Sequence, residues 1–111
     1  MWGKINNKRQ ICIMLFASKL ITSSGNIILN MCDTELLDKI IKDGKTEIKI
    51  SSNYYNEKTI DEVEAEYLLQ KCTSANMVGE KTISLSLRLG IGSEKGVRLI
   101  DGIPLLIIFK M

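Results

Sequence analysis

Residues 72–91 read CTSANMVGEKTISLSLRLGI, and the fold depends on the structure that this stretch adopts. Apolar residues alternate with polar ones through its second half, which is typical of a strand; they are Ile83, Leu85, Leu87, Leu89 and Ile91. The same residues also fit a helical stripe through Val78, Thr82, Leu85 and Leu89. Leu favours helices and Gly90 is well placed to end one, so periodicity alone leaves both structures open for residues 76–90.

Upstream of this stretch, the sequence predicts two strands and a helix. Residues 11–20 and 27–32 are rich in apolar residues, and the turn-forming Ser23-Ser24-Gly25-Asn26 lies between them, so we expect a hairpin. Asp33 is a good helix N-cap, and Gly44 is a typical residue just after a helix. We therefore expect a helix from residue 33 to residue 44, with a buried stripe at Leu36, Leu37, Ile40 and Ile41.

The middle of the chain predicts a further strand, a loop and a second helix. Residues 46–51 alternate, which favours a strand with Ile48 and Ile50 pointing inward. Residues 53–58 are a polar loop. The second helix opens at Thr59, which has the spacing of a capping box with Glu62, and Asp61 is a rival N-cap. Its buried stripe consists of Ala65, Leu68, Leu69 and Cys72.

The C-terminal part of the sequence predicts a second hairpin. Asp101-Gly102 supplies the two positive φ angles of a tight turn between two apolar segments. Pro104 lacks a backbone N–H, so its strand is expected to start at a sheet edge. Residues 103–109 lack alternation, which predicts a strand covered on both faces.

Composition excludes several classes of function. The 111 residues are 45% hydrophobic and 25% charged with a net charge of +2, which is ordinary for one globular domain. The absence of histidine removes the Ser-His triad and every histidine metal site. The three cysteines are far apart, so we expect no thiolate metal centre and a reducing, cytoplasmic location. The longest apolar runs are too short to span a membrane.

Three blocks of sequence, in this order, carry a resemblance to a known family: residues 32–37 (CDTELL), 72–80 (CTSANMVGE) and 98–104 (RLIDGIP). Over about residues 14–111 the chain resembles an archaeal family catalogued as domain of unknown function 424. The resemblance implies a small α+β protein of the archaeal cytosol, with residues 76–90 helical. It brings no established activity, although a role in RNA binding or translation has been suggested for such proteins.

Together these observations predict one α+β domain over residues 14–111, with an N-terminal extension over residues 1–13. We expect a mostly antiparallel sheet of about five strands with three helices, in the order ββαβααββ. Because the resemblance begins at residue 14, Met14 is a candidate for the true start of the protein.

Two groups of residues are candidates for binding. Asn76, Gly79 and Glu80 fit the start of a helix, with Asn76 as its cap and Gly79 allowing another backbone to approach. They also fit a binding site, because a bare first turn offers N–H groups to a phosphate. Tyr54 and Tyr55 lie in a predicted loop, where an exposed tyrosine can stack on bases or anchor a partner, or simply pack over the end of the sheet.

A third group is basic. Lys81, Arg88 and Arg98, together with Lys110, would contact an RNA backbone if they shared one face, and would otherwise be ordinary solvated charges. No residue is singled out as catalytic, no metal ligand set is recognised, and no cofactor is implied. The sequence thus predicts a non-catalytic binding module for RNA or a ribonucleoprotein. The alternatives are a protein–protein adaptor that uses the tyrosines and, less favoured, a small enzyme or nucleotide binder. A membrane partner is not expected.

Overall fold

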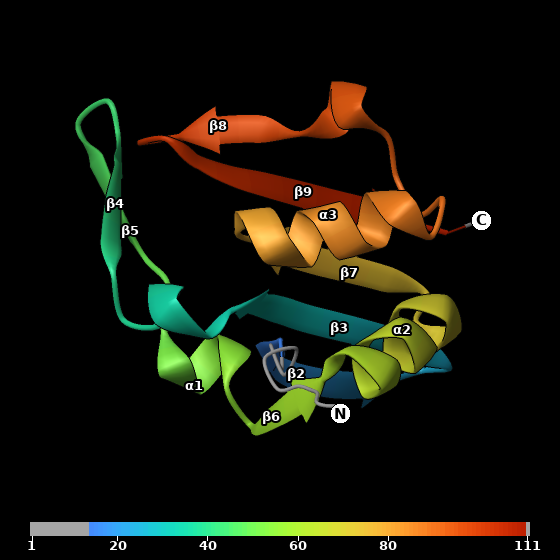
Figure 1. Ribbon diagram of the computed structural model, residues 1–111. Coiled ribbons are helices and arrows are strands. Elements are labelled where there is room, and N and C mark those ends of the chain that lie inside the picture. Colours follow the sequence, from blue (N-terminus) through green and yellow to red (C-terminus); the bar gives the residue numbers. More distant parts are fainter. Residues whose placement is uncertain (1–13, 111) are drawn as a thin grey trace, which may run out of the picture.

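The computed structural model describes residues 14–110, and the fold is α+β (Figure 1). The predicted extension, residues 1–13, lies outside the described residues. In chain order the elements are β2 Leu15–Ser23, β3 Asn26–Asp33, the 3-10 turn η2 Thr34–Leu36, β4 Ile40–Asp43, β5 Thr46–Lys49, α1 Ser52–Tyr55, β6 Lys58–Asp61, α2 Glu62–Lys71, β7 Ser74–Val78, α3 Glu80–Arg88, the 3-10 turn η3 Glu94–Gly96, β8 Arg98–Ile100 and β9 Ile103–Phe109.

Six of the strands form one mixed sheet in the order β6-β2-β3-β7-β9-β8. Only the β3–β7 pair is parallel among these neighbours, so the predicted, mostly antiparallel α+β sheet is confirmed. Both predicted hairpins are present, with positive φ angles at Ser24 and Gly25 and at Asp101 and Gly102. These angles match the right-handed twist of the flanking strands.

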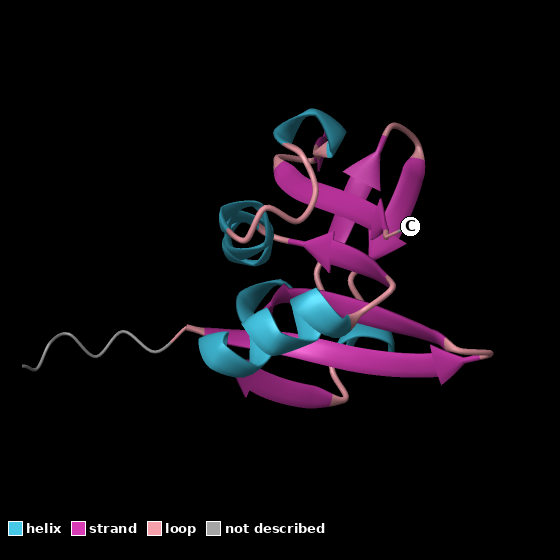
Figure 2. Ribbon diagram, turned by 90° about the vertical axis from the view of Figure 1, so that its right-hand side faces the viewer, coloured by secondary structure: helices cyan, strands magenta, loops and turns pink. Residues whose placement is uncertain are grey.

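Helices α2 and α3 cover one face of the sheet (Figures 1 and 2). The main core lies between them and the sheet, where the largest fully buried side chains are Phe16, Leu29, Met31, Ile60, Leu69, Met77 and Leu85. The predicted stripe of α2 points inward, with Ala65, Leu69 and Cys72 buried and Leu68 half-buried. This layer positions α3 for the site described below.

The opposite face of the sheet is covered at one end only, by α1 and the separate β4–β5 hairpin (Figure 1). A second apolar cluster lies under this cover and includes Ala17, Cys32, Ile41, Ile50, Val78 and Ile100. The prediction that residues 103–109 are covered on both faces is wrong. Leu106 and Ile108 are buried under the helices, but Ile107 and Phe109 point to the uncovered end and are 61% and 77% exposed.

The prediction of a helix over residues 33–44 is wrong, because the structure has the 3-10 turn η2 followed by strand β4 there. The Asp33 carboxylate caps no turn of its own segment. Asp38 has a φ of +66°, and its carboxylate accepts hydrogen bonds from the Ser52 N–H and hydroxyl, which also lower its pKa. Gly44, with a φ of +66°, lies in the two-residue turn that joins β4 to β5. The C-terminal part of the predicted apolar stripe therefore lies in a strand of this hairpin and not in a helix.

Two further boundaries differ from the predictions. The alternation from Ile83 to Ile91 forms no strand, because α3 spans Glu80–Arg88, and the helix that the resemblance implied is present there. The implied helix is wrong for residues 76–78, which belong to β7. Thr59 lies inside β6, and the rival cap Asp61 starts α2 by accepting a hydrogen bond from the Glu64 N–H. The predicted strand over residues 46–51 is present as β5, but it pairs with β4 and not with the main sheet. Gly90, with a φ of +77°, follows the C-cap of α3 as expected.

No helix within residues 14–110 is long and apolar enough to cross a membrane.

Candidate functional site

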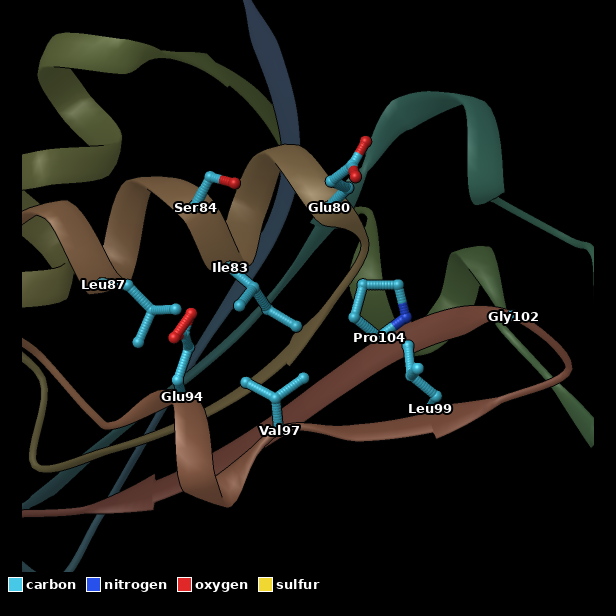
Figure 3. Close-up of a pocket in the computed structure, with 9 residues that line it drawn as sticks. All are labelled: Glu80, Ile83, Ser84, Leu87, Glu94, Val97, Leu99, Gly102 and Pro104. Atoms are coloured by element: carbon cyan, nitrogen blue, oxygen red, sulfur yellow. The ribbon is translucent and has the colours of Figure 1, made fainter.

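A groove runs between helix α3 and the β8–β9 hairpin on the helix-covered face (Figure 3). Helix α3 packs over β3, β7 and β9, but the outermost strand β8 has its Leu99 side chain 72% exposed. The groove has a volume of about 410 Å³ and is lined by Glu80, Ile83, Ser84, Leu87, Glu94, Val97, Leu99, Gly102 and Pro104. Its walls are therefore mostly apolar.

The junction between β3 and α3 fixes one end of this groove. The Asp33 carboxylate is 4% exposed and accepts hydrogen bonds from the Lys81 N–H at 3.0 Å, the Thr82 N–H at 2.8 Å and the Thr82 hydroxyl at 2.8 Å. Gly79 makes room for it, since a Cβ there would lie 2.4 Å from the Asp33 Cγ. Its φ of +111° also favours glycine. The first turn of α3, including Glu80, is thereby held against β3.

The β8–β9 hairpin forms the other wall and the floor. Its tight turn at Asp101-Gly102 pairs Leu99 with Pro104, so both side chains face the same side as α3. The chain approaching β8 lies close to β9, because a Cβ at Gly92 or Gly96 would come within 2.9 or 3.2 Å of the Leu106 side chain. This close approach brings Glu94 and Val97 to the groove.

The charge of the groove is negative. Among the lining residues of the described structure, Glu80 and Glu94 are charged and none is basic. Figure 3 shows Glu80 at the Pro104 end, on the α3 wall, and Glu94 at the Leu87 end, on the η3 wall. The Glu80 side chain points away from the hairpin in Figure 3, so the groove pairs an apolar interior with Glu94 at one end and with Glu80 on the rim at the other.

The basic residues predicted to bind RNA have partners in different places, which are carboxylates for three of them and backbone carbonyls for Lys110. The Lys81 Nζ lies 2.9 Å from Glu35, and the Arg98 guanidinium lies 3.6 Å from Asp43. The Arg88 guanidinium lies 2.6 Å from Glu62 on α2. Lys110 donates to the carbonyls that end α2, those of Leu69 and Gln70. The structure does not gather these four cations into one basic patch.

The predicted phosphate cradle at the start of α3 is already filled. The N–H groups of Lys81 and Thr82 point at the Asp33 carboxylate, which takes the position that an anion would occupy. The prediction that Asn76 caps the helix is wrong, because Asn76 lies inside β7 and the N-cap is Gly79. Gly79 accommodates a carboxylate side chain, not a second backbone.

Asn76 and Tyr54 instead come together on the opposite face of the sheet. The Asn76 Nδ2 donates to Asn30 Oδ1 at 2.8 Å, and the Asn30 Nδ2 donates to the Tyr54 carbonyl at 3.2 Å. The Tyr54 side chain is 48% exposed, whereas Tyr55 packs into the second apolar cluster and burial raises its pKa to about 12. Of the two tyrosines, Tyr54 is the one that a partner can reach.

Within the described residues, no group of three potential ligands could hold a metal ion. Burial raises the pKa of the Cys32 thiol to about 12 and also raises that of Cys72. Both thiols therefore stay protonated near neutral pH, and neither is an activated nucleophile.

Most of the chain matches a known protein family. The family described as Protein of unknown function (DUF424) matches residues 21–111. The chain belongs to the DUF424 family. No curated protein matches it. Among solved structures it is similar to an uncharacterised conserved protein from Methanopyrus kandleri, with a TM-score of 0.76, 19% sequence identity and coverage of 87% of this chain and 92% of that chain. At that identity the similarity establishes the fold alone.

Sequence analysis of this DUF424 chain singled out only Glu80 among the residues that line the groove. A signal for three others was present, because Glu80, Ile83, Ser84 and Leu87 lie at spacings of three, four and seven residues on one side of α3. Buried Thr82, Leu85 and Ser86 lie on the side that packs on the sheet. Leu99, Val97 and Glu94 carried no local signal, because they join the site through the order of strands in the sheet.

Proposed function

We propose that this DUF424 protein is a non-catalytic module that binds a segment of a partner protein in the groove beside α3. The observation that carries the proposal is the exposed Leu99 side chain on a strand that α3 leaves uncovered. A single exposed apolar side chain is common on proteins, but a concave surface lined mostly by apolar side chains is typical of a binding site. Burying a Leu side chain contributes about 1.5–3 kcal/mol to the binding free energy.

An RNA ligand is the alternative that an experiment has to separate from a protein partner. It is supported by the family resemblance and by the exposed cations Lys81, Arg88 and Arg98. Two features weigh against it. Each of these cations faces a carboxylate, and the groove itself carries Glu80 and Glu94, which repel phosphate.

The proposal is tested by selecting displayed random peptides on the full chain, with counter-selection on the Leu99→Asp variant. The matched control is Ile107→Asp, which puts the same charge on an equally accessible apolar residue of the opposite face. We expect enriched peptides that bind the natural chain and the Ile107→Asp control but not Leu99→Asp. Enrichment that survives Leu99→Asp, or no enrichment at all, would overturn the proposal.

A parallel titration with labelled RNA resolves the alternative. If RNA binds with a steep dependence on salt and weakens in Lys81→Ala and Arg88→Ala, while no peptide depends on Leu99, the chain is an RNA-binding module instead. Circular dichroism of each variant checks that the fold is retained.

A further inference from the structure

We infer that the partner segment is an amphipathic helix with basic residues at both ends of its apolar stripe. The inference rests on the proposed function and specifies what the groove binds. It follows from three properties of the groove: its place in the helical layer, the nature of its floor, and the charges at its ends.

The groove lies where a third helix of the layer would lie. Helices α2 and α3 occupy one face of the sheet side by side, linked by the Arg88–Glu62 ion pair. Beyond α3 on this face the described chain adds only the single 3-10 turn η3, which flanks the groove in Figure 3 and leaves Leu99 exposed. Helix α3 already covers Leu106 and Ile108 of β9, so the surface left open beside it consists of Leu99 on β8 and Pro104 at the start of β9, on two strands about 4.8 Å apart. A helix is about 10 Å across and packs 8–10 Å from a neighbouring helix. One added helix beside α3 therefore covers the exposed Leu99.

The floor of the groove excludes an extended partner as the best fit. A strand binds by main-chain hydrogen bonds to the open edge of a sheet. The floor here is instead the face of the β8–β9 hairpin, where the side chains of Leu99 and Pro104 line the groove. The open backbone edge of β8 lies at the outer side of the sheet and not in the floor of the groove. A surface of side chains suits the apolar stripe of a helix, which is read at positions i, i+3, i+4 and i+7.

The length of the groove sets the length of the partner. Glu80 and Leu87 mark its two ends along α3, and seven residues of helix rise about 10 Å. Two turns of a partner helix span this distance. Its apolar stripe would contact Leu87 on α3, beside the buried Ile83, and Val97 and Leu99 on the opposite wall.

The two glutamates of the groove favour basic residues in the partner. Glu80 and Glu94 lie at opposite ends and on opposite walls, and neither forms an ion pair within residues 14–110. A Lys or Arg about two turns apart on the partner, one on each side of its stripe, meets both carboxylates. An acidic helix would bring like charges together at both ends, which disfavours it.

The inference is tested with three labelled 16-residue peptides in a fluorescence anisotropy titration of the full chain. The first has an apolar stripe at helical spacing flanked by Lys. The second is its charge-inverted twin with Glu in place of each Lys. The third has the composition of the first in scrambled order, so that it has the same charge but no stripe.

At 50 mM salt we expect the Lys peptide to bind at least tenfold more tightly than the Glu twin and the scrambled peptide. The double variant Glu80→Lys with Glu94→Lys should reverse the order of the Lys and Glu peptides. Both side chains are exposed, so the variant should fold, and circular dichroism checks this.

The outcomes separate the inference from the function on which it rests. Equal binding of the Lys and Glu peptides, lost in Leu99→Asp and kept in Ile107→Asp, overturns the basic helix and leaves the protein-binding groove intact. Equal binding of the scrambled peptide overturns the helical occupant. If the Lys peptide binds Leu99→Asp as well as the natural chain, both the inference and the proposed use of the groove fail.

Discussion

Helices α2 and α3 lie on the same face of the sheet, yet a carboxylate caps each of them from a different distance along the chain. The cap of α2 is Asp61, the residue just before it, whose Oδ1 accepts a hydrogen bond from the Glu64 N–H at 2.9 Å. The cap of α3 is Asp33 at the end of β3, which is separated in sequence by 48 and 49 residues from the N–H groups that it binds.

The difference shows which helix has its first turn stabilised by a neighbouring residue. The capping residue of α2 directly precedes the helix in the sequence, so the first turn of α2 is stabilised as soon as the local chain is helical. Helix α3 has a glycine at its N-cap, with no side chain to accept a hydrogen bond, and obtains its acceptor only after β3 and α3 have packed. Because α3 is also one wall of the groove, the groove depends on this long-range contact.

The most severe test of the remote cap is Gly79→Ala. The new Cβ would lie 2.4 Å from the Asp33 Cγ in a backbone with a φ of +111°, so it both strains the chain and displaces the buried carboxylate. We expect unfolding in urea to show a loss of about 4 kcal/mol. The matched control is Gly25→Ala, which has a φ of +81° but no atom within 4 Å of the new Cβ, and should lose about 1 kcal/mol. Equal losses in the two variants would contradict the steric account.

Removing the cap itself should have the next largest effect. Asp33→Ala leaves two N–H groups and a hydroxyl of the first turn of α3 without their acceptor, and we expect a loss of about 3 kcal/mol in urea unfolding. Asp33→Asn keeps one acceptor oxygen and should lose about half as much.

A double-mutant cycle checks this contact directly. In the Asp33→Ala background the carboxylate is gone, so Gly79→Ala should be less costly there than in the natural chain. Strictly additive losses would show that the two residues do not act on each other.

Removing the local cap of α2 should reduce the free energy of unfolding less than removing the remote cap of α3. Asp61→Ala removes one hydrogen bond at the exposed start of α2, and we expect a loss of about 1 kcal/mol in thermal or urea unfolding. Thr59→Ala is the control, because Thr59 lies in β6 and caps nothing, so its loss should be smaller. A loss in Asp61→Ala as large as that in Asp33→Ala would remove the distinction between the two helices.

Removing the exposed ion pair between the two helices should have the smallest effect on the free energy of unfolding. Arg88 bridges α3 to Glu62 at 2.6 Å and to Glu66 at 3.8 Å, but its side chain is more than half exposed. Arg88→Ala should therefore lose no more than about 0.5 kcal/mol, and less at high salt. Urea unfolding at low and high salt measures this. A loss above that of Asp61→Ala would mean that the helices are held together mainly by charge.

The sequence predicted the structure correctly where the residues that carry the pattern are close in sequence to the element that they determine. The turns at Ser24-Gly25 and Asp101-Gly102, the stripe of α2 and the C-terminal Gly90 were all predicted from neighbouring residues. The prediction failed over residues 33–44, because the apolar stripe fits both a helix and a 3-10 turn followed by a strand. The Asp33 carboxylate, which was expected to cap that helix, instead binds the first turn of α3, a contact that no local pattern shows.

The groove could be predicted only in part for the same reason. Glu80, Ile83 and Leu87 share one side of α3 and were readable from helical spacing. Leu99 and Glu94 reach the site because β7 inserts between β3 and β9, which places β8 at the edge beyond α3. Strand order arises from packing between distant segments, so a single sequence does not contain it in any short window.

That insertion also bears on how the chain folds as it is synthesised. The N-terminal half emerges from the ribosome with β3 as an unfinished edge, since its parallel neighbour, Ser74–Val78, is made more than forty residues after β3 ends. The strand on the far side of that neighbour, Ile103–Phe109, comes last of all. The sheet is therefore completed from its centre only when nearly the whole chain has been translated, and an arrested or shortened product would expose a strand ready to associate with other nascent chains.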